Sequence, residues 1–386
     1  MYERFLARRL ENSRKSVLLL GPRQVGKSTL LGALQPDLTL NFASATTFRD
    51  YVAHPERLEA ELRAAPARVR TVLLDEVQRV PALLDVVQVV LDANPGRFRF
   101  LLSGSSARKL RRGRANLLPG RVHVHHLHPL LAGELGGAFD LDRVLAHGSL
   151  PGIYAQSDPA TRAMDLRGYA DTYLREEVQA EAIVRDIGGY SRLLDLVAAE
   201  SGKVINLAGL CQKAGLSYET ARRYVEALED TLVVFRVPAW SGSDRASLIA
   251  HPRIFFFDLG VRNALLRRPL ERPLDDERGT LLEHVVAFEI QRRIPDLWPE
   301  ARLFHYRTRH GAEVDFVVEV GRELWAIEVK ASRNLEGRRL LAGFDSLSER
   351  AAGLKRRIVV FLGPRRMNVG KIEAIPLLKF ANELPH

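Results

Sequence analysis

The chain has 386 residues, of which 46% are hydrophobic and 27% charged, a balance that excludes collagen-like, low-complexity and wholly disordered proteins. Its apolar runs are too short to cross a bilayer, and charged residues fill the first ten positions where a signal peptide needs an apolar stretch, so we expect a cytoplasmic protein that does not enter a membrane. The single cysteine, Cys211, excludes an internal disulfide and a multi-thiolate zinc site, and the formal net charge of +10 favours an anionic partner.

The first 135 residues alternate short apolar strands with helical patterns. This alternation predicts an α/β domain with a mostly parallel sheet. The predicted strands are Ser16–Leu20, Leu38–Phe42, Thr71–Leu74, Arg99–Leu102 and Arg121–Leu127.

The remainder of the chain predicts two further domains. Residues 136–266 are mainly helical, with helices expected at 160–184, 191–200, 207–214 and 218–230 and strands at 232–237 and 253–257. Residues 274–386 begin with a helix at 280–293, followed by strands at 303–306, 313–320, 323–329 and 357–361. The Pro- and Arg-rich stretch 267–273 is the expected linker.

A glycine-rich motif of the form G-x-x-x-x-G-K-[ST] follows the first predicted strand and precedes a helical pattern. In this context the loop backbone cradles phosphates, Lys27 reaches the β and γ phosphates, and Ser28 ligates Mg²⁺, so we expect ATP and Mg²⁺ as cofactors. The expected nucleotide-binding residues are Gly21, Pro22, Arg23, Gln24, Val25, Gly26, Lys27, Ser28 and Thr29.

Two adjacent acids end the strand at Thr71–Leu74. At this position Asp75 is expected to hold the Mg²⁺ ion and Glu76 to deprotonate the attacking water. Ser103 and Ser105, at the end of the next strand, are candidates for holding that water, or they form only a turn. Arg121, just before the last strand, is a candidate arginine finger that acts on a neighbouring subunit's nucleotide; the alternative is an intramolecular salt bridge.

The positive charge gathers in one segment. Residues 93–133 contain no acidic residue but eight arginines and lysines. Four of these are candidate DNA contacts: Lys109, Arg111, Arg112 and Arg114. Four histidines, at positions 123, 125, 126 and 128, lie in the same segment, but a metal site is not expected because no carboxylate or thiol accompanies them.

Residues 207–228 predict a helix, a glycine-containing turn and a second helix, and the two strands that follow would form the wing of a winged helix. Asn206 and Ser217 are the expected N-caps. Arg222 and Arg223 on the second helix are candidate DNA contacts, although such modules also pack against protein.

In the last block, Asp315 on one strand and Glu328 and Lys330 on the next fit the pattern D-x(n)-E-x-K. This resembles the PD-(D/E)xK nuclease core, with Glu283 on the preceding helix as a further acid. Such carboxylates would hold divalent ions and the lysine would polarise water. Val314 replaces the proline of the nominal signature, and cores of this kind also serve for binding alone, so cleavage stays open.

The phosphate loop, Asp75-Glu76-Val77-Gln78, Ser103-Gly104-Ser105-Ser106, Leu118-Pro119-Gly120-Arg121 and the string Phe256-Phe257-Asp258-Leu259-Gly260 together resemble the AAA-type ATPases with a C-terminal DUF4143 domain, the AAA_14/DUF4143 family. The resemblance spans essentially the whole chain. It implies an ATP-hydrolysing domain, a winged-helix-like middle and a nuclease-like end.

From these features we expect an ATPase that binds or remodels DNA, including branched DNA, in repair, recombination or defence. The expected assembly is a homo-oligomeric ring, with a hexamer as the candidate. A regulatory module of another class, switched by ATP and binding protein through its winged helix and an inactive nuclease-like domain, is the alternative.

Overall fold

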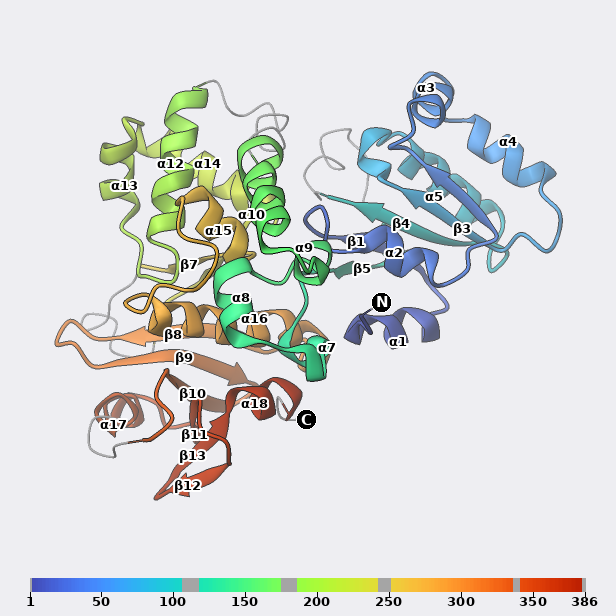
Figure 1. The fold of residues 1–386 in the computed structure, drawn as a ribbon. Helices are drawn as coiled ribbons and strands as arrows, with labels where there is room; N and C mark the ends of the chain where they lie inside the picture. The colour runs from blue at the N-terminus through green and yellow to red at the C-terminus, as the bar shows by residue number, and fades with distance from the viewer. Residues whose placement is uncertain (1, 106–117, 175–185, 242–250, 336–340, 384–386) are drawn as a thin grey trace. The chain divides into compact units, whose positions relative to one another are not determined.

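The computed structural model describes residues 2–105, 118–174, 186–241, 251–335 and 341–383 (Figure 1). They form two compact units, Met1–Leu130 with Glu226–Val233, and Leu131–Val225 with Val234–His386. Over the described ranges, no helix is long and apolar enough to span a bilayer. The division into three domains expected from the sequence stays a prediction.

The first unit is built on a five-stranded sheet in the order β2-β3-β4-β1-β5, in which every neighbouring pair is parallel (Figure 1). All five predicted strands are confirmed to within two residues at each end. Their bounds are β1 (Ser16–Leu20), β2 (Leu38–Asn41), β3 (Thr71–Asp75), β4 (Arg99–Gly104) and β5 (Val122–His126).

Burial explains why these strands are easy to recognise. β1 is buried at all five positions because both faces of a parallel sheet are covered, whereas the edge strand β2 alternates between exposed and half-buried side chains. On one face, Leu18, Leu74 and Leu102 pack with apolar residues of α4 and α5. The helices of this unit are α1 (Phe5–Asn12), α2 (Lys27–Gly32), α3 (Ala45–Ala53), α4 (Arg57–Ala64) and α5 (Leu83–Ala93), with a 3₁₀ turn at Val77–Arg79.

The strand order determines where the candidate motifs meet. β4 lies between β1 and β3, and all three run in the same direction. The carboxyl ends of β1, β4 and β3 therefore lie side by side, as binding sites in parallel sheets do. The phosphate loop, Ser103 and the acid pair follow these three ends.

The second unit begins with a helical region. Its α-helices are α7 (Ala132–Leu135), α8 (Leu141–His147), α9 (Pro151–Ala155), α10 (Pro159–Gly168), α12 (Ile187–Ala199), α13 (Leu207–Ala214), the first part of α14 (Tyr218–Asp230), whose residues from Glu226 onward belong to the first unit, and α15 (Leu259–Leu265). The expected helix over 160–184 differs from the structure: α10 ends at Gly168, a residue of low helix propensity, and a π-helical segment continues to Leu174. Residues 175–185 lie outside the described ranges.

The predicted helix pair at 207–228 is present as α13 and α14. α13 ends at Gly215, whose φ of +68° suits glycine. The Asn206 side chain accepts a hydrogen bond from the Gly209 amide (3.3 Å) and the Ser217 hydroxyl accepts one from the Thr220 amide (3.2 Å), so both predicted N-caps are confirmed. β6 (Val234–Val237) and β7 (Arg253–Phe256) then pair in antiparallel fashion.

The Asp258 motif has a structural role within this unit. Asp258 is fully buried, and its carboxylate accepts hydrogen bonds from the Val261 amide at the start of α15 (3.1 Å) and from the Ser149 amide (2.8 Å). Gly148 is required beside it, because a Cβ there would lie 2.0 Å from Oδ1 of Asp258. Burial raises the pKa of this carboxyl. The string therefore joins α15 to the loop after α8.

The C-terminal part of the second unit is a six-stranded mixed sheet in the order β12-β13-β11-β10-β9-β8 (Figure 1). Its elements are α16 (Arg278–Leu297), β8 (Arg302–Arg307), β9 (Glu313–Val320), β10 (Glu323–Lys330), α17 (Leu341–Arg350), β11 (Leu354–Phe361), β12 (Met367–Val369), β13 (Ile372–Pro376) and α18 (Leu377–Glu383). The predicted strands β8 to β11 are confirmed, and β12 and β13 were not predicted. Antiparallel pairing places β9 beside both β8 and β10.

Candidate functional site

The glycine-rich loop has the backbone that its sequence requires. Gly26 has a φ of +93° and Gln24 a φ of +62°, both in the left-handed region. Gly21 allows a close approach, because a Cβ there would lie 2.2 Å from the Leu127 carbonyl oxygen. The loop leads directly into α2, so its amides and the helix N-terminus point to one anion-binding position.

Lys27 is 4% exposed and folds back onto the loop. Its Nζ donates hydrogen bonds to the carbonyl oxygens of Gly21 (2.9 Å) and Pro22 (3.0 Å). The next residue, Ser28, donates a hydrogen bond from its hydroxyl to Oδ1 of Asp75 (2.9 Å). A Mg²⁺ ion held by Ser28 and Asp75 would replace this contact, and their oxygen atoms are the donors that Mg²⁺ prefers. The serine and the aspartate thus form a direct pair, and the lysine precedes this serine at the start of α2.

Ser103 joins β4 to the acid pair. Its fully buried hydroxyl donates a hydrogen bond to Oδ1 of Asp75 (2.5 Å) and accepts one from the Glu76 amide (2.9 Å). These contacts show that the Ser103 hydroxyl positions the acid pair. That Ser103 or Ser105 also holds the attacking water stays a prediction.

Glu76 adopts an uncommon backbone conformation, with a φ of +61°. Its Oε2 accepts a hydrogen bond from Nε2 of Gln78 (2.5 Å), which also donates to the Ser105 hydroxyl (3.2 Å). Sequence reasoning assigned no role to Gln78, although its place two residues after the acid pair could have drawn attention to it. The amide orients the carboxylate proposed as the base.

A second residue without an assigned role is Arg4. It is buried, and its guanidinium donates hydrogen bonds to the Val25 carbonyl in the glycine-rich loop (2.9 Å) and to the His128 carbonyl after β5 (2.5 Å). Arg4 therefore links the glycine-rich loop to the segment after β5. The other expected loop residues, Arg23, Gln24, Ser28 and Thr29, are exposed.

Arg121 forms a bidentate ion pair with Asp92, at the end of α5. Nε and Nη2 lie 2.7 and 2.8 Å from the two carboxylate oxygens. The hydrogen bonds from Arg121 lower the pKa of the Asp92 carboxyl. Arg121 precedes β5, whereas the phosphate loop follows the parallel strand β1, so the arginine is at the opposite end of the sheet from its own nucleotide site. The intramolecular salt bridge thus exists, and action on a neighbouring subunit stays a prediction.

The expected DNA contacts are divided between two regions. Lys109, Arg111, Arg112 and Arg114 lie outside the described residues. On α14, Arg222 pairs with Glu219 (2.7 Å), and Arg223 is exposed. The ion pair neutralises part of the positive charge of this helix.

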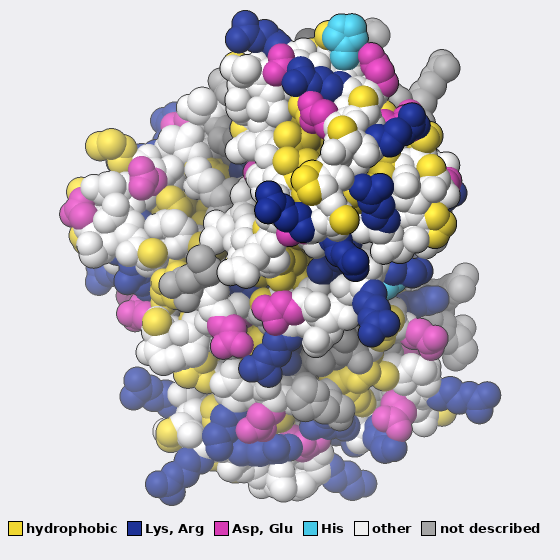
Figure 2. All heavy atoms as spheres, turned by 90° about the vertical axis from the view of Figure 1, so that its right-hand side faces the viewer, with side chains coloured by type: hydrophobic (Ala, Val, Ile, Leu, Met, Phe, Trp, Pro, Cys, Tyr) yellow, Lys and Arg dark blue, Asp and Glu magenta, His cyan; other side chains and the backbone are white. Residues whose placement is uncertain are grey.

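A basic cleft of about 720 Å³ lies in the first unit, between the end of α1 and strand β5. Three exposed cationic side chains line it, those of Arg9, Arg14 and Lys15, and His123 and His125 line the opposite wall. Among the described residues that line it, none is acidic. The remaining lining residues are Asn12, Ser13, Val122 and Val124. The space-filling view in Figure 2 shows one face of the molecule, on which Lys and Arg side chains are interspersed with Asp and Glu.

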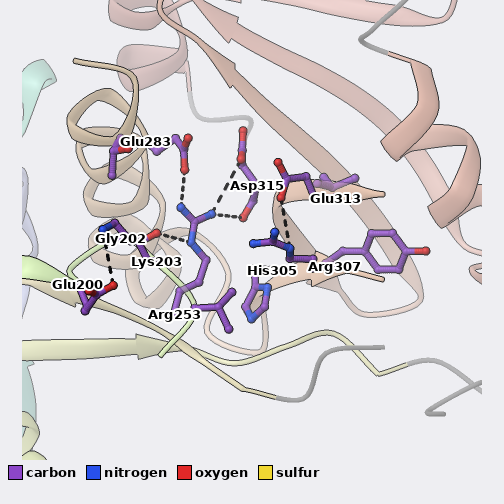
Figure 3. A pocket seen from close by; sticks show the side chains of 13 residues that line it. Glu200, Gly202, Lys203, Arg253, Glu283, His305, Arg307, Glu313 and Asp315 are labelled. Atoms are coloured by element: carbon purple, nitrogen blue, oxygen red, sulfur yellow. Dashed lines mark hydrogen bonds and ion pairs between the residues drawn. The ribbon is translucent and has the colours of Figure 1, made fainter. Parts of the chain in front are cut away.

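In the second unit the four residues of the expected nuclease-like site come together, and we name them the acidic centre: Glu283, Asp315, Glu328 and Lys330. Lys330 Nζ donates a hydrogen bond to Oε2 of Glu328 (2.7 Å), and Oδ2 of Asp315 accepts one from the Val329 amide (2.8 Å). Sequence reasoning missed Arg253, whose guanidinium forms an ion pair with Glu283 (Figure 3).

Burial raises the pKa of all three carboxyls of the acidic centre, and repulsion adds to this effect. For Glu283 and Glu328, desolvation is the larger cause and the Asp315 charge the second. Desolvation also raises the pKa of Asp315. Desolvation is the largest single cause and alone would lower the pKa of Lys330, but the charge and hydrogen bond of Glu328 and the charges of Asp315 and Glu283 together raise it.

The acidic centre is occupied by cations of the protein itself. An arginine contacts Glu283, a lysine contacts Glu328 and a backbone amide contacts Asp315, each at one of the two carboxylate oxygens. A Mg²⁺ or Ca²⁺ ion needs several oxygen ligands at about 2.0–2.6 Å and would compete with Arg253 for them. In the part of the chain that the structure describes, no group of three or more His, Cys, Asp or Glu side chains has an arrangement that could hold a metal ion.

Comparison with protein families defines the class of the first unit. Residues 13–136 match a family described as AAA domain, and with the loop and acid pair at the end of a parallel sheet they form an AAA-type P-loop ATPase domain. Residues 138–272 match a domain of unknown function, DUF8612, and residues 278–380 match another, DUF4143. The AAA domain implies nucleotide binding.

Among individual proteins, the chain is similar to the uncharacterized protein Rv2008c of Mycobacterium tuberculosis and to the uncharacterized protein Mb2031c of Mycobacterium bovis. Each is 28% identical over 321 residues, which is 81% of this chain and 70% of the relative.

Similar solved structures include PCH-2 of C. elegans (17% identity, 59% of this chain and 66% of that chain), VC1899 of Vibrio cholerae (11%, 96% and 96%) and the STAND protein PH0952 of Pyrococcus horikoshii (11%, 75% and 45%). All three have a TM-score of 0.22, which supports no argument about this chain.

Proposed function

We propose that this protein is an ATPase that binds the phosphate backbone of DNA and couples the two activities. The hydrolytic part depends on one arrangement: Lys27 in the loop, Ser28 against Asp75, and Glu76 held by Gln78 and Ser103. ATP with Mg²⁺ would place its phosphates at the loop, and Glu76 would accept a proton from the attacking water.

The basic cleft is the observation that supports DNA as the partner. Cationic side chains attract phosphates, and the lack of acidic residues among the described lining lets their fields add instead of cancelling. Histidines on β5 can donate further hydrogen bonds to phosphate oxygens. Arg222 is a weaker candidate because Glu219 already accepts its hydrogen bonds.

We also propose that the active form is a homo-oligomeric ring, with a hexamer as the candidate. Arg121 is too far from its own loop to act there, so its expected role as an arginine finger requires a neighbouring copy. Its release from Asp92 would accompany assembly. Repair, recombination and defence remain the processes in which such an activity would serve.

The proposal is tested by fluorescence anisotropy with labelled duplex, single-stranded and four-way-junction DNA at two salt concentrations. The E76Q variant with ATP and Mg²⁺ keeps the nucleotide-bound state during the measurement. Affinity for duplex should fall with salt with a log–log slope of about −0.9 for each phosphate contact. R14A/K15A should weaken binding to all three DNAs. It should also reduce the log–log slope by the contribution of roughly two phosphate contacts.

Arg322→Ala provides the matched control, because this exposed arginine lies in the turn between β9 and β10 in the other unit. It should leave both affinity and slope unchanged. Binding that is absent at low salt, or that R14A/K15A and R322A affect equally, would contradict the assignment of the cleft.

Two observations favour the alternative, an ATP-switched regulatory module. Four of the six charged residues of α14 are acidic, and the acidic centre contains its own cation, so neither part has the charge typical of a nucleic-acid surface. A protein that hydrolyses ATP normally but binds no DNA would support this alternative.

A further inference from the structure

The acidic centre already contains a cation. Arg253, the first residue of β7, reaches from the β6–β7 pair into the space between α16 and β9 (Figure 3). Its side chain is about 10% exposed. The guanidinium lies between the carboxylates of Glu283 and Asp315, which is the position that a shared metal ion would need.

Every nitrogen of this guanidinium has a partner. Nη2 donates a hydrogen bond to Oε2 of Glu283, and Nη1 donates one to the backbone carbonyl of Asp315 (3.3 Å) and lies 3.9 Å from its Oδ1. Nε donates a hydrogen bond to the carbonyl oxygen of Gly202 (2.7 Å). The position of the cation is therefore defined by side chains and backbone together.

Two aromatic rings hold the same group. The guanidinium carbon lies 5.3 Å from the ring centre of Phe255 and 5.5 Å from that of Phe316, both within the range of cation–π attraction. Phe255 is on β7 and Phe316 on β9. Both rings are buried, so the faces that hold the guanidinium belong to the core, while Arg253, Glu283 and Asp315 also line a pocket of about 370 Å³.

One oxygen atom of Asp315 and one of Glu328 also accept a hydrogen bond. Oδ2 of Asp315 accepts the Val329 amide, and Oε2 of Glu328 accepts Lys330 Nζ. A divalent ion between Glu283 and Asp315 would have to displace Arg253, and it would find these two carboxylate oxygens already accepting a hydrogen bond.

From this geometry we propose that Arg253 is the permanent counter-ion of the acidic centre, so that the nuclease-like sheet binds no divalent metal and cleaves no nucleic acid. The arginine instead fastens the β6–β7 pair to α16 and β9. This inference is independent of the proposed function, because it concerns neither ATP hydrolysis nor the basic cleft.

The raised pKa values of Glu283, Asp315 and Glu328 agree with this role. Desolvation and mutual repulsion oppose the simultaneous ionisation of the three carboxyls. A single guanidinium with fixed hydrogen bonds neutralises part of this charge without an ion that must first lose its water shell.

The test is Mn²⁺ binding to the whole 386-residue chain without nucleotide, followed by calorimetry and by the shift of the melting temperature. The wild type and D315N should bind Mn²⁺ identically, since any ion held elsewhere, for example by Ser28 and Asp75, is common to both. R253M should gain a site with at least roughly tenfold tighter binding and a higher melting temperature in Mn²⁺, and R253M/D315N should lose that gain. Plasmid DNA should stay intact with the wild type in Mn²⁺.

A Mn²⁺ site or a cleavage activity in the wild type that D315N removes would overturn the proposal. So would a folded R253M protein that gains no site, because the arginine would then not be what excludes the metal. R253K keeps a positive charge and serves as the folding control. If R253M fails to fold, the comparison of the wild type with D315N decides the matter.

Discussion

The Ser103 hydroxyl donates a 2.5 Å hydrogen bond to Oδ1 of Asp75, which also accepts the Ser28 hydroxyl. One oxygen atom therefore connects β4, β3 and the start of α2. Since Ser103 also accepts the Glu76 amide, any shift of β4 would move the expected Mg²⁺ ligand and the expected base together. The serine links the conformation of the sheet to the geometry of hydrolysis.

Replacing Ser103 with Ala should impair turnover more than nucleotide binding. The Glu76 amide would lose its acceptor, at a cost of about 1–3 kcal/mol in stability, and turnover should fall roughly tenfold to a hundredfold because the base is misplaced. ATP affinity should change only slightly. Steady-state hydrolysis and equilibrium nucleotide binding measure the two effects, and S157A, at an exposed serine in the other unit, is the control. An equal loss of affinity and turnover would argue against a positioning role.

Lys27 and Glu76 should separate binding from hydrolysis. K27A removes the charge-assisted contacts to the phosphates and should weaken ATP binding by roughly a hundredfold. E76Q keeps the shape of the side chain but removes the base, so binding should persist while turnover falls by about 10²–10⁴. K213A, at an exposed lysine on α13, is the control for loss of charge. Normal hydrolysis by E76Q would show that another group is the base.

Arg121 gives a prediction that depends on assembly. If it acts on a neighbouring subunit, turnover per subunit should rise with protein concentration, and R121A should lose about 10³-fold or more. A mixture of R121A and E76Q should recover activity, since the first contributes an intact base and the second an intact arginine. A monomer with full activity at every concentration would contradict this role.

Glu289 on α16 predicts a pH dependence of stability. It is 2% exposed, and burial raises its pKa to about 7 from 4.5, so the folded state holds this proton more tightly than the unfolded state. Protonation of Glu289 contributes about 3 kcal/mol to the free energy of unfolding below about pH 4.5. This contribution is lost as the pH rises to about 7.

The variant E289Q removes this titration while its amide oxygen can still accept the hydrogen bond from the Ala132 amide, 2.7 Å in the wild type. Its stability relative to the wild type should therefore increase between pH 5 and pH 8. Urea unfolding of both proteins at the two pH values measures the difference in their free energy of unfolding. The other carboxyls contribute equally in both proteins, so their contributions cancel in this difference. The exposed control E300Q should show no such trend. An E289Q difference that is flat with pH would show that the buried carboxyl keeps its charge.

The features that the sequence predicts correctly are those whose signal lies within a short stretch of the chain. β1 to β5 carry continuous or alternating apolar residues, and the loop from Gly21 to Ser28 has fixed spacing, so local pattern was sufficient. Asn206 and Ser217 could be recognised as caps because a cap acts within three residues. Such signals do not depend on how the chain folds back on itself.

The parts that sequence could not supply depend on long-range contacts. Arg253 is 62 residues from Asp315 and was assigned only to an apolar strand. The basic cleft is lined by residues around α1 and on β5. None of these residues is among the DNA contacts that the sequence predicts. β13 was missed because its five residues end in Pro376 and α18 follows at once, so no turn signal separates them. Tertiary packing, not local propensity, places each of these.

The charged lining around β5 also affects how copies of this domain can associate. β5 is an edge strand, and an edge presents unpaired N–H and C=O groups to any other extended chain. Lysine and arginine beside such an edge oppose the approach of a second identical edge, which would bring like charges together. The same side chains that suit a polyanion therefore protect the sheet from extending into an aggregate through β5, and they do so whether or not a ligand is bound.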